Sequence, residues 1–196
     1  RRRLRALARA DAGALAIIDH VARDMAERLS AVERRFATAL DIESPGGRMA
    51  EALAASARVE SVIRMERHPG LLVGKCIGLV GDVEALPIAP ETLDLAVACL
   101  SLQAVDDLPG ALIQIRRALR PDGLFLAAVA AGETLTELRF SLALAEEEVS
   151  GGASPRVMPF ADLRDLGGLL QRAGFALPVA DVDRITVRYR DPFALF

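Results

Sequence analysis

A short turn between an apolar run and a helical pattern carries the residues best placed for chemistry. The run 36–42 enters this turn, and the pattern 48–57 leaves it. A strand, a glycine-containing turn and a helix N-terminus form the nucleotide cradle of open α/β folds. Such a loop carries glycine at alternate positions, but here Glu43 and Pro45 precede the glycine at Gly47. The sequence therefore predicts a ligand-binding loop with an altered capacity for a nucleotide.

The rest of the chain supplies the elements that position this loop. Apolar runs bounded by turn residues alternate with helical patterns, and the connections are short. This alternation predicts an α/β fold with a parallel, doubly wound sheet. The expected strands are 36–42, 59–65, 76–80, 94–100 and 124–130, and the expected helices among them are 48–57 and one that Asp106 or Asp107 caps and that ends before 120–123.

Right-handed crossovers place the carboxyl ends of parallel strands at one edge of the sheet. Ligands of open α/β sheets bind in the crevice at that edge. The loops after the expected strands should therefore converge into one site. These loops contain 43–47, Glu66, Asp82 and 100–103.

Helical patterns flank this core. The lead-in segment 1–33 has one apolar stripe, and its basic start at 1–5 is interpreted as a solvated helix face rather than the tail of a transit peptide. After Gly132, the sequence Thr134 to Glu137 predicts a capping box that opens a helix of about 15 residues. A further helix is expected at 161–173 and a long strand at 179–189, and the whole chain is predicted to be a single domain, with parts 1–33, 34–130 and 131–196.

Composition limits the function classes. The chain is 52% hydrophobic and 26% charged, which is typical of a globular protein, and its net charge of −3 argues against a nucleic-acid-binding surface. Cys76 and Cys99 lie in apolar runs without a paired-cysteine motif, which predicts reduced thiols in a cytoplasmic, bacterial protein. His20 and His68 lack the spacing of metal ligands, so no metal site is assigned. No apolar run reaches the roughly 18 residues of a membrane span.

Segments after the loop resemble the class I S-adenosylmethionine (SAM)-dependent methyltransferases. They are 81–87, 93–97 and 108–125, and their order and spacing match that superfamily across most of residues 36–130. The resemblance implies a Rossmann-like, mainly parallel sheet. It also implies binding of SAM and transfer of its methyl group to an acceptor that the sequence does not identify.

The same resemblance implies roles for the loop residues. Asp41 matches the acidic residue that closes the first strand and supports the loop, although it could simply cap the following turn. Gly46 and Gly47 match the end of the loop, where the backbone approaches the cofactor closely. Glu43 should crowd the cofactor and repel its methionine carboxylate, and Pro45 removes a backbone donor. These changes would cost about 1–3 kcal/mol of binding.

Further roles fall on residues after the other strands. Glu66 lies where an acid accepts hydrogen bonds from the two ribose hydroxyls, or it is a solvated strand end. Asp82 and Val83 lie where the adenine is held, although Asp82 could be only a turn residue. Leu100 lines the floor near the sulfonium. Gln103 stands where relatives often have histidine, so no catalytic residue is named.

Three downstream segments resemble the respiratory complex I assembly factor 5 group and its bacterial relatives. They are 132–139, 154–160 and 181–189. This group is related to the malonyl-carrier-protein methyltransferase of biotin synthesis, and its members add a last strand that this chain is expected to lack. The resemblance implies an alternative function, an assembly factor that acts on a complex I subunit by arginine hydroxylation or chaperone-like binding. A non-catalytic relative with a degenerate SAM loop is the third alternative.

Overall fold

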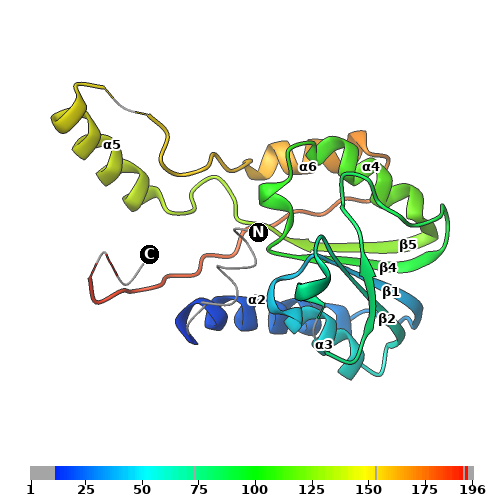
Figure 1. The fold of residues 1–196 in the computed structure, drawn as a ribbon. Coiled ribbons are helices and arrows are strands. Elements are labelled where there is room, and N and C mark those ends of the chain that lie inside the picture. The colour runs from blue at the N-terminus through cyan, green and yellow to red at the C-terminus, as the bar shows by residue number, and fades with distance from the viewer. Residues whose placement is uncertain (1–11, 73, 153, 192, 194–196) are drawn as a thin grey trace.

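A five-stranded parallel sheet forms the centre of the computed structural model, which describes residues 12–72, 74–152, 154–191 and 193 (Figure 1). The strand order is β3-β2-β1-β4-β5. Every strand pair is parallel, so the carboxyl ends share one edge, and the predicted doubly wound α/β fold is confirmed. The strands are β1 (Phe36–Ile42), β2 (Val59–Glu66), β3 (Ile77–Val80), β4 (Leu93–Cys99) and β5 (Leu119–Ala128).

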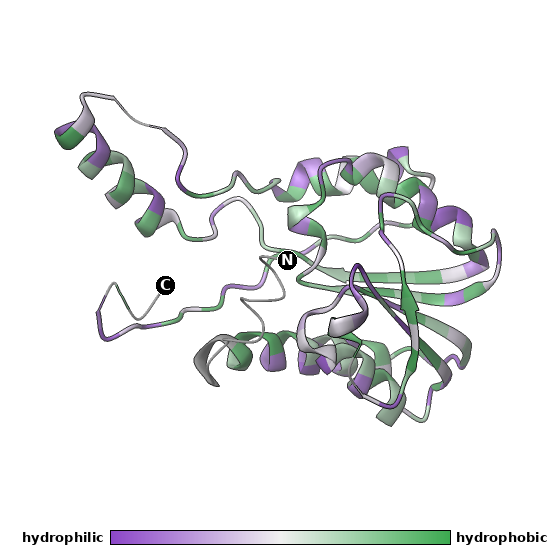
Figure 2. Cartoon of the chain, viewed as in Figure 1, coloured by the Kyte–Doolittle hydropathy of each residue, from purple (hydrophilic) through white to green (hydrophobic). Residues whose placement is uncertain are grey.

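Helices cover both faces of the sheet. In Figure 1, α2 and α3 lie against one face and α4 and α6 against the other, whereas α5 projects away from the sheet. Figure 2 shows mixed apolar and polar residues around α5, and no described residue of α5 is buried. The helices are α2 (Ala12–Ser30), α3 (Arg48–Ala55), α4 (Leu108–Ala118), α5 (Thr136–Ser150) and α6 (Leu163–Arg172), with 3-10 turns η1 (Pro45–Gly47), η2 (Pro69–Leu71) and η3 (Leu102–Ala104).

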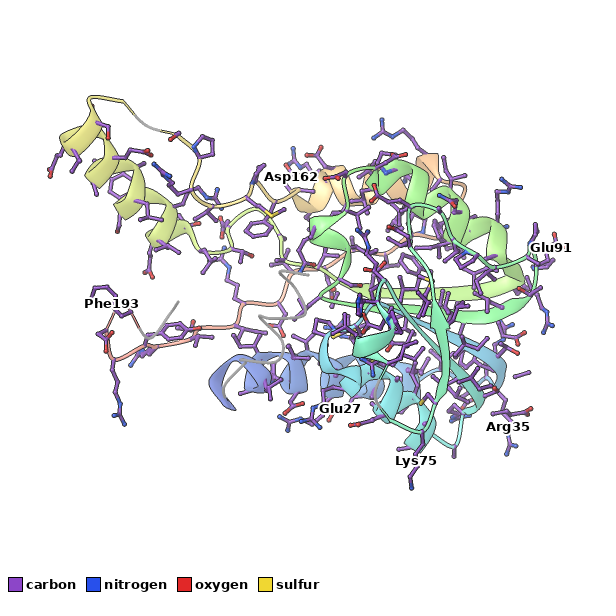
Figure 3. All side chains as sticks on the ribbon, in the orientation of Figure 1. Glu27, Arg35, Lys75, Glu91, Asp162 and Phe193 are labelled. Carbon is purple, nitrogen blue, oxygen red and sulfur yellow. The ribbon has the colours of Figure 1, made fainter. Side chains whose placement is uncertain are left out.

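Two hydrophobic clusters sandwich the central strands. Met25 of α2 and Leu53 of α3 pack with Phe36 on one face, and Ile115 of α4 packs with Leu40 on the other. Nearly every residue of β4 is buried, as expected of a central strand that is covered on both sides. Side chains fill the space between the sheet and these helices, whereas those of α5 extend into the open (Figure 3).

Two helix starts show how local chemistry sets the boundaries. Asp107 caps α4, because its carboxylate accepts a hydrogen bond from Gly110 N at 2.9 Å. The capping box predicted for α5 is wrong. Its first helical residue is Thr136, which follows Leu135 in a left-handed conformation (φ 56°), and the Thr136 hydroxyl donates to Glu133 O. Thr134 instead lies in a turn, where its N–H donates to Ala131 O.

The long strand predicted at 179–189 is wrong, because this segment joins no sheet in the described part of the chain. A strand needs a neighbour to complete its hydrogen-bond ladder. The segment instead lies beside α2 and the turn before α5, through ion pairs of Asp181 with Arg28 and of Arg184 with Glu133. Alternation alone therefore overestimated this strand. The basic start at 1–5 and the first third of the lead-in segment lie outside the described residues.

Candidate functional site

Backbone hydrogen bonds bring the loops after β1, β2 and β3 together. The N–H of Glu43 donates to Met65 O at 2.9 Å, and the N–H of Gly81 donates to Glu66 O at 3.0 Å. The loop after β4 joins them, because the hydroxyl of Ser101 donates to Ile42 O at 2.7 Å. The predicted convergence of loops at one sheet edge is therefore confirmed.

The glycine loop has a backbone that requires glycine. Gly46 and Gly47 both have left-handed conformations, with φ angles of 69° and 74°. A Cβ atom on Gly47 would lie 2.6 Å from Nη1 of Arg64, so only glycine fits there without displacing the guanidinium. The loop is also fastened to β4, because the Ser44 hydroxyl accepts a hydrogen bond from Cys99 N at 3.0 Å.

A buried charge cluster lies beneath this loop. Arg64 and Glu66 form an ion pair of 2.9 Å with side-chain exposures of 3% and 1%. The interpretation of Glu66 as a solvated strand end is therefore wrong. Asp41 lies opposite Arg64 in the register of β1 and β2 and is fully buried.

Burial controls the protonation of Asp41. It raises the pKa of this carboxyl to about 7, against smaller lowering effects of the nearby Ser44 hydroxyl and the Arg64 charge. Neither Asp41 oxygen makes a hydrogen bond of ordinary geometry with the described residues. Asp41 therefore sits beneath the loop with a proton affinity that falls within the physiological range.

Glu43 points toward the turn after β3. Its side chain is 2% exposed, and Oε1 accepts a hydrogen bond from Val83 N at 3.2 Å. Oε2 lies 3.0 Å from Nε of Arg67. The charge predicted to repel the methionine carboxylate of SAM is therefore paired within the protein. The backbone of Glu43 is itself left-handed, with φ 51°.

Arg67 joins Glu43 to two more acids. Its Nη2 lies 3.1 Å from Asp82 Oδ1 and 3.4 Å from Glu84 Oε2. Burial alone would lower the pKa of Arg67, but its hydrogen bond to Glu43 and the three carboxylate charges raise it above the usual value. Glu84 in turn accepts a hydrogen bond from Asp107 N at 2.8 Å, so the network reaches the start of α4.

The candidate cofactor residues thus fall into separate groups. Asp41, Gly47 and Glu66 surround Arg64, and Gly46 lies beside them in the loop. Asp82 and Val83 surround the Glu43–Arg67 pair. Leu100 lies apart at the end of β4, where it has φ 51° and its N–H donates to Ala128 O.

Both arginines were missed as site residues in the sequence, although they flank Glu66 at the end of β2. Arg64 could have been found from the pairing of β2 with β1, because that register places it opposite Asp41.

The groups that the resemblance assigns to SAM are paired within the protein. The resemblance implies that Asp82 and Val83 lie where the adenine is held, with Asp82 accepting from its exocyclic amine, and that Glu66 holds the ribose. In the structure these groups are engaged by Arg67, Glu43 and Arg64 respectively. These contacts therefore use part of the hydrogen-bonding capacity that an adenosine moiety would need.

A separate cavity of about 150 Å³ opens near the ends of β4 and β5. Gln103 contributes its one amide side chain: Nε2 donates to Leu100 O at 2.9 Å, whereas the buried Oε1 has no hydrogen-bond partner among the described residues. This cavity was not predicted from the sequence. Its lining consists of Leu102, Gln103, Val105, Leu108, Val129, Ala130, Pro159, Ala161 and Leu166.

Three other expectations can be compared with the described residues. Cys76 and Cys99 are unpaired, with Cys99 buried and Cys76 partly buried. Among the residues that the structure describes, no three His, Cys, Asp or Glu side chains gather closely enough to hold a metal ion. Within the same residues, no helix is both long and apolar enough to cross a membrane.

The sheet order, the left-handed glycine loop and the acids after consecutive strands define the class of protein. The chain matches the methyltransferase domain family over residues 40–127. A methyltransferase of Haloferax volcanii, solved with its Trm112 activator, has the same fold, with a TM-score of 0.62 at 20% identity over 79% of this chain and 67% of that one. The chain therefore has the fold of the class I methyltransferase superfamily, and its residues 40–127 match the methyltransferase domain family.

The chain is also similar to two kinds of protein. It is 38% identical to the mitochondrial arginine-hydroxylase NDUFAF5 of Danio rerio, over 87% of this chain and 55% of the relative. It is 31% identical to a malonyl-[acyl-carrier protein] O-methyltransferase of Gallionella capsiferriformans, over 85% of this chain and 61% of the relative. Both resemblances seen in the sequence are confirmed. The chain spans little more than half the length of these relatives.

Proposed function

We propose that this chain is the methyltransferase-fold part of a complex I assembly factor that acts on an arginine-containing partner protein without using SAM in the ordinary way. The observation that carries the proposal is the hydrogen bond from Val83 N to Glu43, because it engages the backbone of a residue that the resemblance places beside the adenine. The 38–40% identity to the arginine-hydroxylases of Danio rerio and Mus musculus supports the same direction.

The cavity beside Gln103 is the proposed site for the partner's side chain. Its apolar walls suit the aliphatic stem of an arginine. The unpartnered Gln103 Oε1 can accept a hydrogen bond from an N–H group at the end of that side chain. The chain's own residues would then bind and orient the arginine, and a complex I subunit would be the partner.

Methyl transfer from SAM is the second candidate. The family match over 40–127 and the retained acids Asp41, Glu66 and Asp82 favour it. SAM would supply an electrophilic methyl group, and the chain would contribute mainly orientation of the acceptor. This candidate requires Glu43 and Arg67 to leave the adenine side of the crevice. A cytoplasmic, bacterial location belongs to both candidates as a prediction.

Mass analysis of a co-expressed complex I subunit tests the proposal. We expect the subunit to co-purify with the protein or, when dioxygen and a two-electron reductant are supplied, to gain the mass of one oxygen on an arginine. A gain of one methylene would support the second candidate instead. A subunit that neither binds nor changes mass would contradict the proposal.

A matched pair of variants localises the effect. Ala130→Phe fills the cavity and should abolish binding or modification, whereas Ala54→Phe on the exposed face of α3 should leave both unchanged. Equal behaviour of the two variants would exclude the cavity as the site.

A further inference from the structure

We infer that Glu43 and Arg67 form an internal latch that takes the place of adenine in the crevice and gives the chain its selectivity against adenine nucleosides. This inference deepens the proposed function, and it rests on that function for the assignment of this crevice as the place where adenine would bind. It assigns a role in ligand selectivity to the side chains of Glu43 and Arg67.

The latch satisfies the backbone N–H of Val83. This residue is 1% exposed, so its backbone N–H needs a hydrogen-bond acceptor within the protein or a bound ligand. Glu43 Oε1 provides that acceptor at 3.2 Å. The side chain of a residue in the first loop therefore reaches across to the third loop, and it satisfies the donor from inside the protein.

The latch also pairs the buried charge of Glu43 with a cation. A carboxylate that is 2% exposed is costly to bury unless a cation pairs with it. Arg67 supplies this cation, and its two ends contact different acids: Nε contacts Glu43 at 3.0 Å, and Nη2 contacts Asp82 at 3.1 Å. The same guanidinium thus engages Asp82, the other residue expected to hold the adenine. Each half of the latch keeps the other in place.

The latch lies at the sheet edge where three loops meet. Glu43 follows β1, Arg67 follows β2, and Asp82 and Val83 follow β3, so the contacts tie together three loops at the same sheet edge. The Arg67 side chain is 38% exposed, whereas Glu43 is almost fully buried. Arg67 is therefore the part of the latch that solvent reaches, and Glu43 is the part that fills the space next to Val83.

Calorimetry with adenosine and with SAM tests the latch. The double variant Glu43→Gly/Arg67→Ala removes both side chains, so Val83 N loses its carboxylate acceptor and Asp82 loses its arginine partner. We expect this variant to bind both ligands at least tenfold more tightly than the unaltered protein, which is about 1.4 kcal/mol. The control variant Glu60→Ala/Arg172→Ala removes the same two charges at exposed positions and should bind no better than the unaltered protein.

A folded double variant that binds no more tightly than the unaltered protein would overturn the inference. Circular dichroism establishes whether the variant is folded. If it is not, the amide resonance of Val83 in the unaltered protein serves as the readout. That resonance should stay unchanged when adenosine is added in millimolar excess, and a saturable shift would overturn the inference.

The partner-binding experiment separates this inference from the proposed function. Neither Glu43 nor Arg67 lines the Gln103 cavity, so the latch and the cavity are different sites. A double variant that gains adenosine binding but no longer binds the complex I subunit would support the latch while counting against a SAM-independent action on the partner. A double variant that keeps subunit binding and gains no adenosine binding would overturn the latch alone.

Discussion

The guanidinium of Arg64 occupies the space that a side chain on Gly47 would need, because Nη1 lies 2.6 Å from the position of a Cβ atom. Gly47→Ala should therefore lower the free energy of unfolding by about 1–3 kcal/mol, from backbone strain at φ 74° together with displacement of Arg64. Urea unfolding followed by circular dichroism measures this loss.

Gly151 provides the matched control for Gly47. It has a similar φ of 68°, but a Cβ atom there would meet nothing within 4 Å. Gly151→Ala should cost only the strain, about 1 kcal/mol. Equal losses in the two variants would show that Arg64 does not restrict position 47.

The Arg64–Glu66 pair gives a second prediction. Arg64→Met would leave the buried Glu66 carboxylate without its cation, so the free energy of unfolding should fall by about 3–5 kcal/mol. Adding Glu66→Gln removes the stranded charge and should restore a large part of this loss. If the double variant were no more stable than Arg64→Met, the pairing would not account for the loss.

Asp41 gives a prediction for pH. Its pKa is about 7 in the folded protein and near the ordinary value of 3.8 when unfolded. Between these values the folded state holds a proton that the unfolded state releases, so this contribution to stability is fully present below about pH 4 and is lost as the pH rises through about 7. A shift of about three units corresponds to at most roughly 4 kcal/mol.

Asp41→Asn should remove this dependence. Urea unfolding at several pH values between about 4 and 8 compares the two proteins. The unaltered protein should lose more stability than the variant across this interval. Parallel pH profiles would mean that Asp41 is ionised in the folded protein at all these values.

A buried hydroxyl fastens the loop after β4. Ser101 donates to Ile42 O at 2.7 Å and is 5% exposed, whereas Ser30 makes a hydrogen bond of the same length to Glu27 O at the exposed end of α2. Ser101→Ala should lower the free energy of unfolding by about 1–3 kcal/mol, because it leaves a buried carbonyl without this donor. Ser30→Ala should change it by less than about 0.5 kcal/mol. Similar effects at both sites would contradict the difference in burial.

Local patterns were enough to predict the sheet core. The nearly continuous apolar run of β4 and the turn residues around it predicted a central parallel strand, and a helix capped by Asp106 or Asp107 was predicted where α4 begins. These features depend on short-range chemistry, which a single sequence displays. The segment 179–189 shows the limit, because a strand depends on a neighbour that alternation cannot reveal.

The candidate site could be predicted only as a location. Convergence at one sheet edge follows from the topology of parallel strands, and it placed Glu66, Asp82 and the loop 43–47 there. The partners of these acids depend on side-chain directions between loops, which the sequence does not encode locally. Glu43 was recognised as an unusual loop residue, but its contact with Val83 and its pairing with Arg67 appear only in the folded chain.

Titration of the unaltered protein with SAM by calorimetry tests the central claim most directly. The contacts of Glu43, Arg67 and Arg64 predict no saturable heat at millimolar SAM, since the groups for adenine and ribose are already engaged. Saturable binding with a micromolar Kd would contradict the account, because it would show that SAM enters the crevice despite the internal pairs.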